Sequence, residues 1–141
     1  MKAYGMFRII AAAAVLLIAT SWSGHADAAF GRTKPILNIV DEPVATGSGD
    51  RPNLMEVERA IRAGAVQKGW LVTKIKDGHL QAELTLRRHF AKVDIIFTPE
   101  TYSITYNDSQ MLRYDGHKIH RNYNKWIEFM ADRIREQFTR L

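Results

Sequence analysis

Residues 71–106 alternate between apolar and polar side chains in four successive runs, and this period of two most constrains the fold. Alternate residues of a strand point to opposite faces, so each run predicts a strand with one apolar face. Asp77-Gly78 and Pro99-Glu100 supply turn signals between runs. We therefore expect a four-stranded antiparallel meander, with one face packed and the other solvated.

The first run predicts an apolar face made of Leu71, Thr73 and Ile75. Val72 then falls on the solvated face, where it forms a small apolar contact patch if Ile96 lies beside it. The other members of the predicted solvated face carry charges of both signs, which favours cross-strand pairing. They are Lys74, Lys76, Gln81, Glu83, Thr85, Arg87, Lys92 and Asp94.

Apolar residues at helical spacing flank the meander on both sides. The first predicted helix covers residues 54–68, with Asn53 and Glu56 as a capping box and Gly69 as the left-handed residue after it. The second covers residues 123–140, capped by Asn122 or Asn124. Two amphipathic helices and a half-apolar sheet bury each other, which predicts a two-layer α+β domain in the order α-β-β-β-β-α.

Residues 29–52 precede this domain and contain three of the four prolines together with Gly47-Ser48-Gly49. This composition predicts a tether, and the β-rich residues 36–40 predict a short N-terminal edge strand within it. The expected organisation is a leader at residues 1–28, the tether at 29–52 and a single domain at 53–141.

The leader has the features of a secretory signal peptide. Lys2 and Arg8 precede an apolar run at residues 9–18, and the small-residue tripeptide Ala26-Asp27-Ala28 follows. We expect cleavage after Ala28 and a periplasmic protein, with no stable transmembrane anchor after cleavage. The alternative is a leader retained as an anchor, although the apolar run is much shorter than the ~20 residues that span a bilayer.

The whole chain lacks cysteine, which excludes disulfides, thiolate chemistry and lipid attachment to an N-terminal cysteine. Of its 20 basic and 15 acidic residues the leader holds two and one, so 18 and 14 remain in the mature chain. This mild positive charge favours encounter with anionic components of the cell envelope. The basic residues are spread along the chain without a stripe of stacking aromatics, so we expect no nucleic-acid partner.

The densest polar segment is residues 107–124, between the last strand and the last helix. Loops carry function more often than scaffolds do, and aromatic, Arg and His side chains suit contact with a polar ligand or a protein. Within this segment the candidate ligand- or partner-binding residues are Arg113, Tyr114, Asp115, His117, His120 and Arg121. The structural alternative is that Asx residues close turns and tyrosines pack at the sheet edge.

A second reading of the same segment is a small metal-dependent or acid–base hydrolase that uses Asp115, His117 and His120. The spacing of these residues in a Gly-containing loop does not define a metal site, and the chain has no Gly-x-Ser-x-Gly elbow and no Gly-rich phosphate loop. The sequence therefore indicates no catalytic residue, no metal and no cofactor. A separate basic cluster, made of Arg87, Arg88, His89 and Lys92, either meets a phosphate or is solvated.

Three blocks of sequence, at residues 101–109, 112–116 and 119–126, resemble a group of small exported proteins of proteobacteria. Gly69-Trp70 and residues 36–40 are also similar to that group, so the likeness spans most of the mature chain. Some members are lipoproteins, and this chain departs from them because it has no cysteine. The resemblance implies an exported location and carries no activity, cofactor or site residues with it.

Together these observations predict a non-enzymatic interaction or ligand-binding module of the cell envelope. Its expected partner is an envelope protein, a peptide or an anionic envelope component. A further possibility is that the edge strand at residues 36–40 adds to the sheet of a partner.

Overall fold

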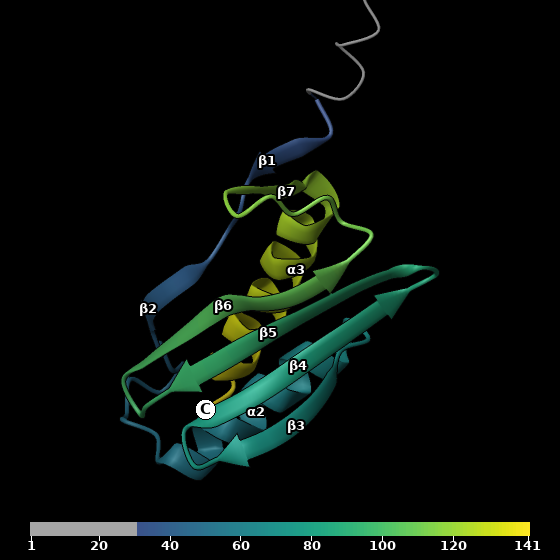
Figure 1. Ribbon diagram of the computed structural model, residues 1–141. Coiled ribbons are helices and arrows are strands. Elements are labelled where there is room, and N and C mark those ends of the chain that lie inside the picture. The colour runs from purple at the N-terminus through teal and green to yellow at the C-terminus, as the bar shows by residue number, and fades with distance from the viewer. Residues whose placement is uncertain (1–30) are drawn as a thin grey trace, which may run out of the picture.

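The computed structural model describes residues 31–141 and shows two helices packed on one face of an antiparallel sheet (Figure 1). The predicted signal peptide, its cleavage after Ala28 and residues 29–30 lie outside the described residues. Among the described residues, no helix is long and apolar enough to cross a membrane. The α+β class predicted from the sequence is confirmed.

The main sheet has five strands in the order β2-β6-β5-β4-β3, all neighbours antiparallel. The four predicted strands are its members β3 (Leu71–Lys76), β4 (His79–Leu86), β5 (His89–Phe97) and β6 (Thr101–Gln110). Gly78 has a φ of 75°, the left-handed conformation that the predicted Asp77-Gly78 turn requires. The four predicted strands pair antiparallel in sequence order, but the sheet differs from the predicted four-stranded meander because β2 (Ile39–Pro43) adds a fifth strand beside β6.

Of the predicted edge strand at residues 36–40, only the last two residues are in a strand, at the start of β2, and a second strand, β1 (Thr33–Pro35), precedes the predicted range. β1 pairs with β7 (Lys118–His120) in a separate small sheet, and β2 pairs with β6. Between them the backbone bonds to side chains: Leu37 N–H donates to Asn124 Oδ1 at 3.0 Å, and Asn124 Nδ2 donates to Pro35 O at 2.8 Å. These bonds replace a strand ladder at residues 36–38, so the predicted strand is interrupted there.

Both helices form where the apolar spacing predicts them, with shifted ends. α2 (Leu54–Val66) begins with the expected capping box of Asn53 and Glu56 and ends two residues early. α3 (Arg121–Phe138) begins earlier than predicted because His120 caps it, while Asn124 is engaged with the β1–β2 segment. The prediction of Asn122 or Asn124 as the cap is wrong.

The core lies between the helices and the sheet, and its largest fully buried side chains come from both layers. The prediction for the faces of β3 is wrong: Val72 packs against the core, whereas Leu71 and Ile75 are 68% and 50% exposed. Register explains the reversal, because Val72 pairs with buried Ala82 and Leu71 pairs with Glu83 on the solvated face. A one-residue shift in register exchanges the two faces of a strand, so sequence alone cannot assign them at this edge.

Glu42 of β2 and Arg135 of α3 join the sheet edge to the helix layer. Arg135 donates through Nε and Nη2 to the two carboxylate oxygens, the Nη2 bond being 2.8 Å. These hydrogen bonds lower the pKa of Glu42 below its ordinary value. A lowered folded-state pKa adds stability above the unfolded pKa, and this stability is lost as pH falls through the folded-state pKa.

We therefore expect Glu42→Gln to lower the free energy of unfolding by about 1 kcal/mol at neutral pH. The free energy of unfolding of this variant should also decrease less than that of the wild type as the pH is lowered. Urea denaturation between neutral pH and pH 3 checks this. Glu128→Gln is the control, since Glu128 is exposed on α3, the helix that carries Arg135, and makes no ion pair with any described residue. If the free energy of unfolding decreased equally with pH in the Glu42 variant and the wild type, the Glu42–Arg135 pair would not be the source of this stability.

Candidate anion-binding site

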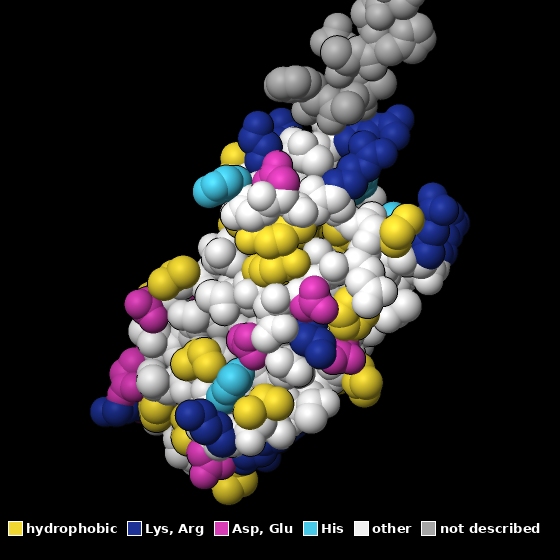
Figure 2. Space-filling view, viewed as in Figure 1, with side chains coloured by type: hydrophobic (Ala, Val, Ile, Leu, Met, Phe, Trp, Pro, Cys, Tyr) yellow, Lys and Arg dark blue, Asp and Glu magenta, His cyan; other side chains and the backbone are white. Residues whose placement is uncertain are grey.

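Three segments that are distant in the sequence meet at one end of the domain and enclose a pocket of about 310 Å³. The first is the segment just before β1, and the second is the β4–β5 turn. The third is the β6–β7 connection together with His120, the N-cap of α3. The lining consists of Arg32, Arg88, His89, Met111, Arg113 and His120. In Figure 2 the dark-blue Lys and Arg side chains gather at this end of the molecule.

The backbone around this pocket holds three non-glycine residues with positive φ. Arg87, the first residue of the two-residue β4–β5 turn, has φ 57°, and Met111 and Arg113 have φ 60° and 55°. Such conformations cost of order 1 kcal/mol each and persist where surrounding contacts hold them. Between the last two, Leu112 is fully buried and its carbonyl accepts from His120 N–H at 2.8 Å. Leu112 thus anchors the loop while Met111 and Arg113 stand outside the core.

The charges in this pocket are uncompensated. Several cations elsewhere on the domain are paired, as in Lys92–Glu83 at 2.7 Å and Lys74–Asp77 at 2.7 Å. By contrast, Arg32, Arg88 and Arg113 form no ion pair with any residue between 31 and 141. No carboxylate occurs among the described residues that line the pocket. Its potential is therefore positive, and the N-terminus of α3 adds to it with the same sign.

The positive potential of the pocket affects the protonation of His120. Burial, then the charges of His89, Arg113, Arg121 and Arg32, hold the pKa of His120 below its ordinary value. Its Nδ1 accepts a hydrogen bond from Asn122 N–H at 3.3 Å, which leaves the proton of the neutral ring on Nε2. Its ring centroid lies 6.4 Å from that of His89. A neutral Nε2–H is a donor, so His120 adds hydrogen-bonding capacity to a pocket already rich in donors.

The six residues predicted for binding divide between two places. Arg113 and His120 line the pocket, and Arg121 lies close enough to act on His120 electrostatically. The other three lie in the loop beyond it. Tyr114 packs against Tyr106 with ring centroids 4.2 Å apart and ring planes tilted by 38°, and its hydroxyl donates to Gly116 O. His117 is exposed.

Asp115, the acid of the predicted hydrolase, is occupied by its own loop. Its Oδ1 accepts from Lys118 N–H at 2.7 Å and from His117 N–H at 2.9 Å, and these two bonds lower its pKa. This is the Asx turn expected under the structural alternative. No set of three or more His, Asp or Glu side chains in residues 31–141 is placed to hold a metal ion.

Sequence reasoning missed that the two basic regions form one site. Arg88 and His89 were assigned to a separate cluster, and Arg32 was placed in the tether. The signal for joining them was weak: Arg-Arg at a two-residue turn, with neither Gly nor Asn to ease a positive φ, indicates a turn held by its surroundings. Pairing of β1 with β7 brings Arg32 to the same end, and this pairing has no local sequence signature.

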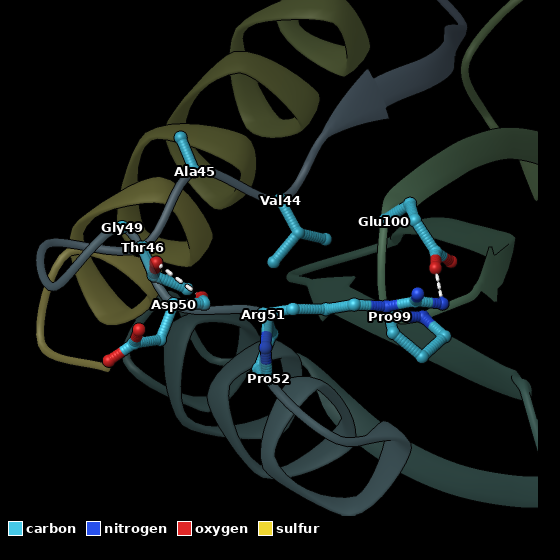
Figure 3. Close-up of a pocket in the computed structure, with 9 residues that line it drawn as sticks. All are labelled: Val44, Ala45, Thr46, Gly49, Asp50, Arg51, Pro52, Pro99 and Glu100. Atoms are coloured by element: carbon cyan, nitrogen blue, oxygen red, sulfur yellow. Dashed lines mark hydrogen bonds and ion pairs between the residues drawn. The ribbon is translucent and has the colours of Figure 1, made fainter.

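Two other polar features are structural. A cavity of about 340 Å³ lies beneath the β2–α2 loop, and Figure 3 shows Arg51 reaching across it to an ion pair with Glu100. In the same loop Thr46 Oγ1 donates to Asp50 O at 2.8 Å. The loop thus satisfies its own polar groups, and the cavity has no convergent set of unpaired charges.

The second feature lies on the solvated face of the sheet around Asp94. His79 is the first residue of β4, and its Nε2 is 2.8 Å from Asp94 Oδ1. Asn107 Nδ2 donates to Asp94 Oδ2 at 2.6 Å. Burial raises the pKa of Asp94, but the hydrogen bonds from Asn107, His79 and Gln81 outweigh it, so the pKa lies below its ordinary value. A carboxylate with both oxygens engaged stabilises the sheet and is poorly placed to act as a base.

No family model matches this chain, and neither a curated protein nor a solved structure does. The resemblance to exported proteobacterial proteins therefore stays a prediction.

Proposed function

We propose that this protein is a non-enzymatic binding module of the cell envelope, exported to the periplasm, that holds its ligand by an anionic group in the cationic pocket. The observation that carries the proposal is the convergence of Arg32, Arg88 and Arg113 without any paired carboxylate. Guanidinium groups donate in a fixed fork that matches phosphate and carboxylate oxygens. An envelope protein, a peptide with acidic groups, and a phosphorylated envelope component all offer such a group.

Binding is favoured over catalysis by the composition of the pocket. Its described lining contains donors and cations but no carboxylate, hydroxyl or thiol to act as a base or nucleophile. His89 and His120 are the titratable groups present, and His120 already uses Nδ1 to cap α3. The hydrolase hypothesis required Asp115, whose hydrogen bonds to the loop backbone support a structural role instead.

We expect Arg88→Gln to weaken the binding of inorganic pyrophosphate about tenfold, because one charge-assisted contact is worth about 1.4 kcal/mol or more. Isothermal titration calorimetry of the full chain gives the dissociation constant. Arg87→Gln is the matched control: it removes the same charge from the same turn, but Arg87 does not line the pocket. Its affinity should stay within about twofold of the wild type.

An NMR titration of His120 supplies a second readout. An anion beside this ring favours its charged form, so its pKa should rise when pyrophosphate is added and should rise less in the Arg88→Gln variant. Equal affinities in the Arg88 and Arg87 variants, together with an unchanged titration of His120, would refute binding at this pocket.

A further inference from the structure

We propose that the cationic end docks on the surface of a bilayer containing anionic phospholipid, with an adjoining apolar groove meeting the lipid chains. The proposal rests on the proposed function for the electrostatic part, since the same arginines contact the headgroup phosphates. It adds a class of partner and a second surface that the pocket alone does not suggest.

The groove has a volume of about 250 Å³ and lies between α3 and the end of β4. Two of its apolar side chains are about half exposed: Phe129 is 51% exposed and Leu86 is 44% exposed. Met111, at the rim of the cationic pocket, is 58% exposed. The rest of the groove is formed by Lys68, Trp70, Leu84 and Trp126.

The pocket and the groove adjoin at the β4–β5 hairpin. Leu86 of the groove is the direct cross-strand partner of His89 of the pocket, so their side chains stand on the same face of the hairpin. Arg88 lies between them in the turn. α3 contributes to both sites as well, through His120 at its cap and Trp126 and Phe129 in its first turns.

The charges around this surface fit an anionic sheet of headgroups better than a single small anion. Exposed basic residues without a described ion-pair partner lie on or beside the segments that form the pocket: Arg32, Lys34, Arg88, Arg113 and Arg121. A small soluble anion can be bound by a few of these residues and would make no contact with an apolar groove. Aromatic and aliphatic side chains beside basic ones are the composition of surfaces that lie in a membrane interface. Lys68 is another basic residue beside an aromatic one, since its Nζ lies over the Phe129 ring, 5.4 Å from the ring centroid.

Vesicle flotation of the full chain tests the proposal, with vesicles of equal parts phosphatidylglycerol and phosphatidylcholine against vesicles of phosphatidylcholine alone. We expect tighter binding to the anionic vesicles and weakening by added salt. The double variant Arg88→Gln with Arg113→Gln should bind the anionic vesicles roughly twenty- to thirtyfold more weakly, because each basic residue near such a surface contributes about a factor of five. Its control is Arg59→Gln with Lys76→Gln, two exposed cations away from this end.

A second pair of variants isolates the groove. Leu86→Ser with Phe129→Ser should weaken vesicle binding about tenfold, since two half-exposed apolar side chains no longer enter the lipid. Leu71→Ser with Ile75→Ser is the control, because these residues are as exposed but lie on β3. Every variant carries the same residues 1–30, so any contribution of that segment to vesicle binding cancels in the comparison.

Equal binding to both kinds of vesicle, or equal loss in the test and control variants, overturns the docking proposal. If the wild type then still binds pyrophosphate in an Arg88-dependent manner, the pocket holds a soluble anion and the proposed function stands without the membrane. The converse outcome is a wild type that does not bind pyrophosphate but binds anionic vesicles, with the losses expected in the test variants. In that case the surface is a lipid-docking face and the pocket is not a site for a soluble ligand.

Discussion

We expect Gly64→Ala to lower the free energy of unfolding by about 2–4 kcal/mol, even though alanine is the better helix former by about 1 kcal/mol. At this position α2 crosses α3 so closely that an added Cβ would lie 2.6 Å from Ile134 N, 2.7 Å from Ile134 Cα and 2.8 Å from Arg133 C. These are backbone atoms, so no side-chain rotation relieves the clash. The helices have to separate and lose packing along their shared face. Urea denaturation followed by circular dichroism measures the loss.

Val66→Ala is the control for Gly64→Ala. Val66 is the last residue of the same helix and is 60% exposed, so its truncation should change stability by no more than about 0.5 kcal/mol. A Gly64→Ala variant as stable as the wild type would show that α2 and α3 can move apart at little cost. The close crossing would then not determine how the helix layer packs.

Tyr106→Ala is expected to cost about 2–3 kcal/mol and to weaken pyrophosphate binding at the same time. The Tyr106 ring lies between two others, 4.2 Å from the centroid of Tyr114 in the β6–β7 connection and 5.9 Å from that of Tyr123 in α3. Without it, Tyr114 loses its packing partner and the connection that carries Arg113 becomes less ordered. Denaturation and calorimetry on the same preparation measure the two effects.

Tyr106→Phe separates the ring from its hydroxyl. The phenyl ring keeps both aromatic contacts and loses the hydrogen-bonding distance of 3.0 Å to Ser109 Oγ. We expect a stability loss of about 1 kcal/mol or less and unchanged affinity for pyrophosphate. If the alanine variant bound as tightly as the wild type, the contacts among the three tyrosines would be a packing feature that does not position Arg113.

The position of Arg113 illustrates how the scaffold determines the site. Leu112 points into the core and is held by the hydrogen bond from His120, so its two neighbours with positive φ are turned outward. Arg88 and Arg32 are brought opposite by a hairpin turn and by the pairing of β1 with β7. Three cations kept close together repel one another, and they stay there because their backbones are fixed by neutral packing.

The features that depend on local pattern were predictable from the sequence. Period-two alternation identified β3 to β6, Asp77-Gly78 identified their first hairpin, and the apolar spacing from Leu54 onward identified α2 together with its cap at Asn53. Each of these signals acts over a few residues and depends on strand geometry, turn conformation or a free helix end. Nothing distant in the chain had to be known.

Features that depend on which segments meet were decided by the tertiary structure. The chain gives Leu71 and Val72 similar apolar character, and only the pairing with β4 turns Val72 inward. Asn124 is a plausible helix cap by type, yet it binds the β1–β2 segment because that segment lies beside α3. The cationic pocket is the functional case, since Arg32, Arg88 and Arg113 are far apart in the sequence and carry no shared motif. Long-range pairing specifies their convergence, because register and packing are collective properties of the whole core.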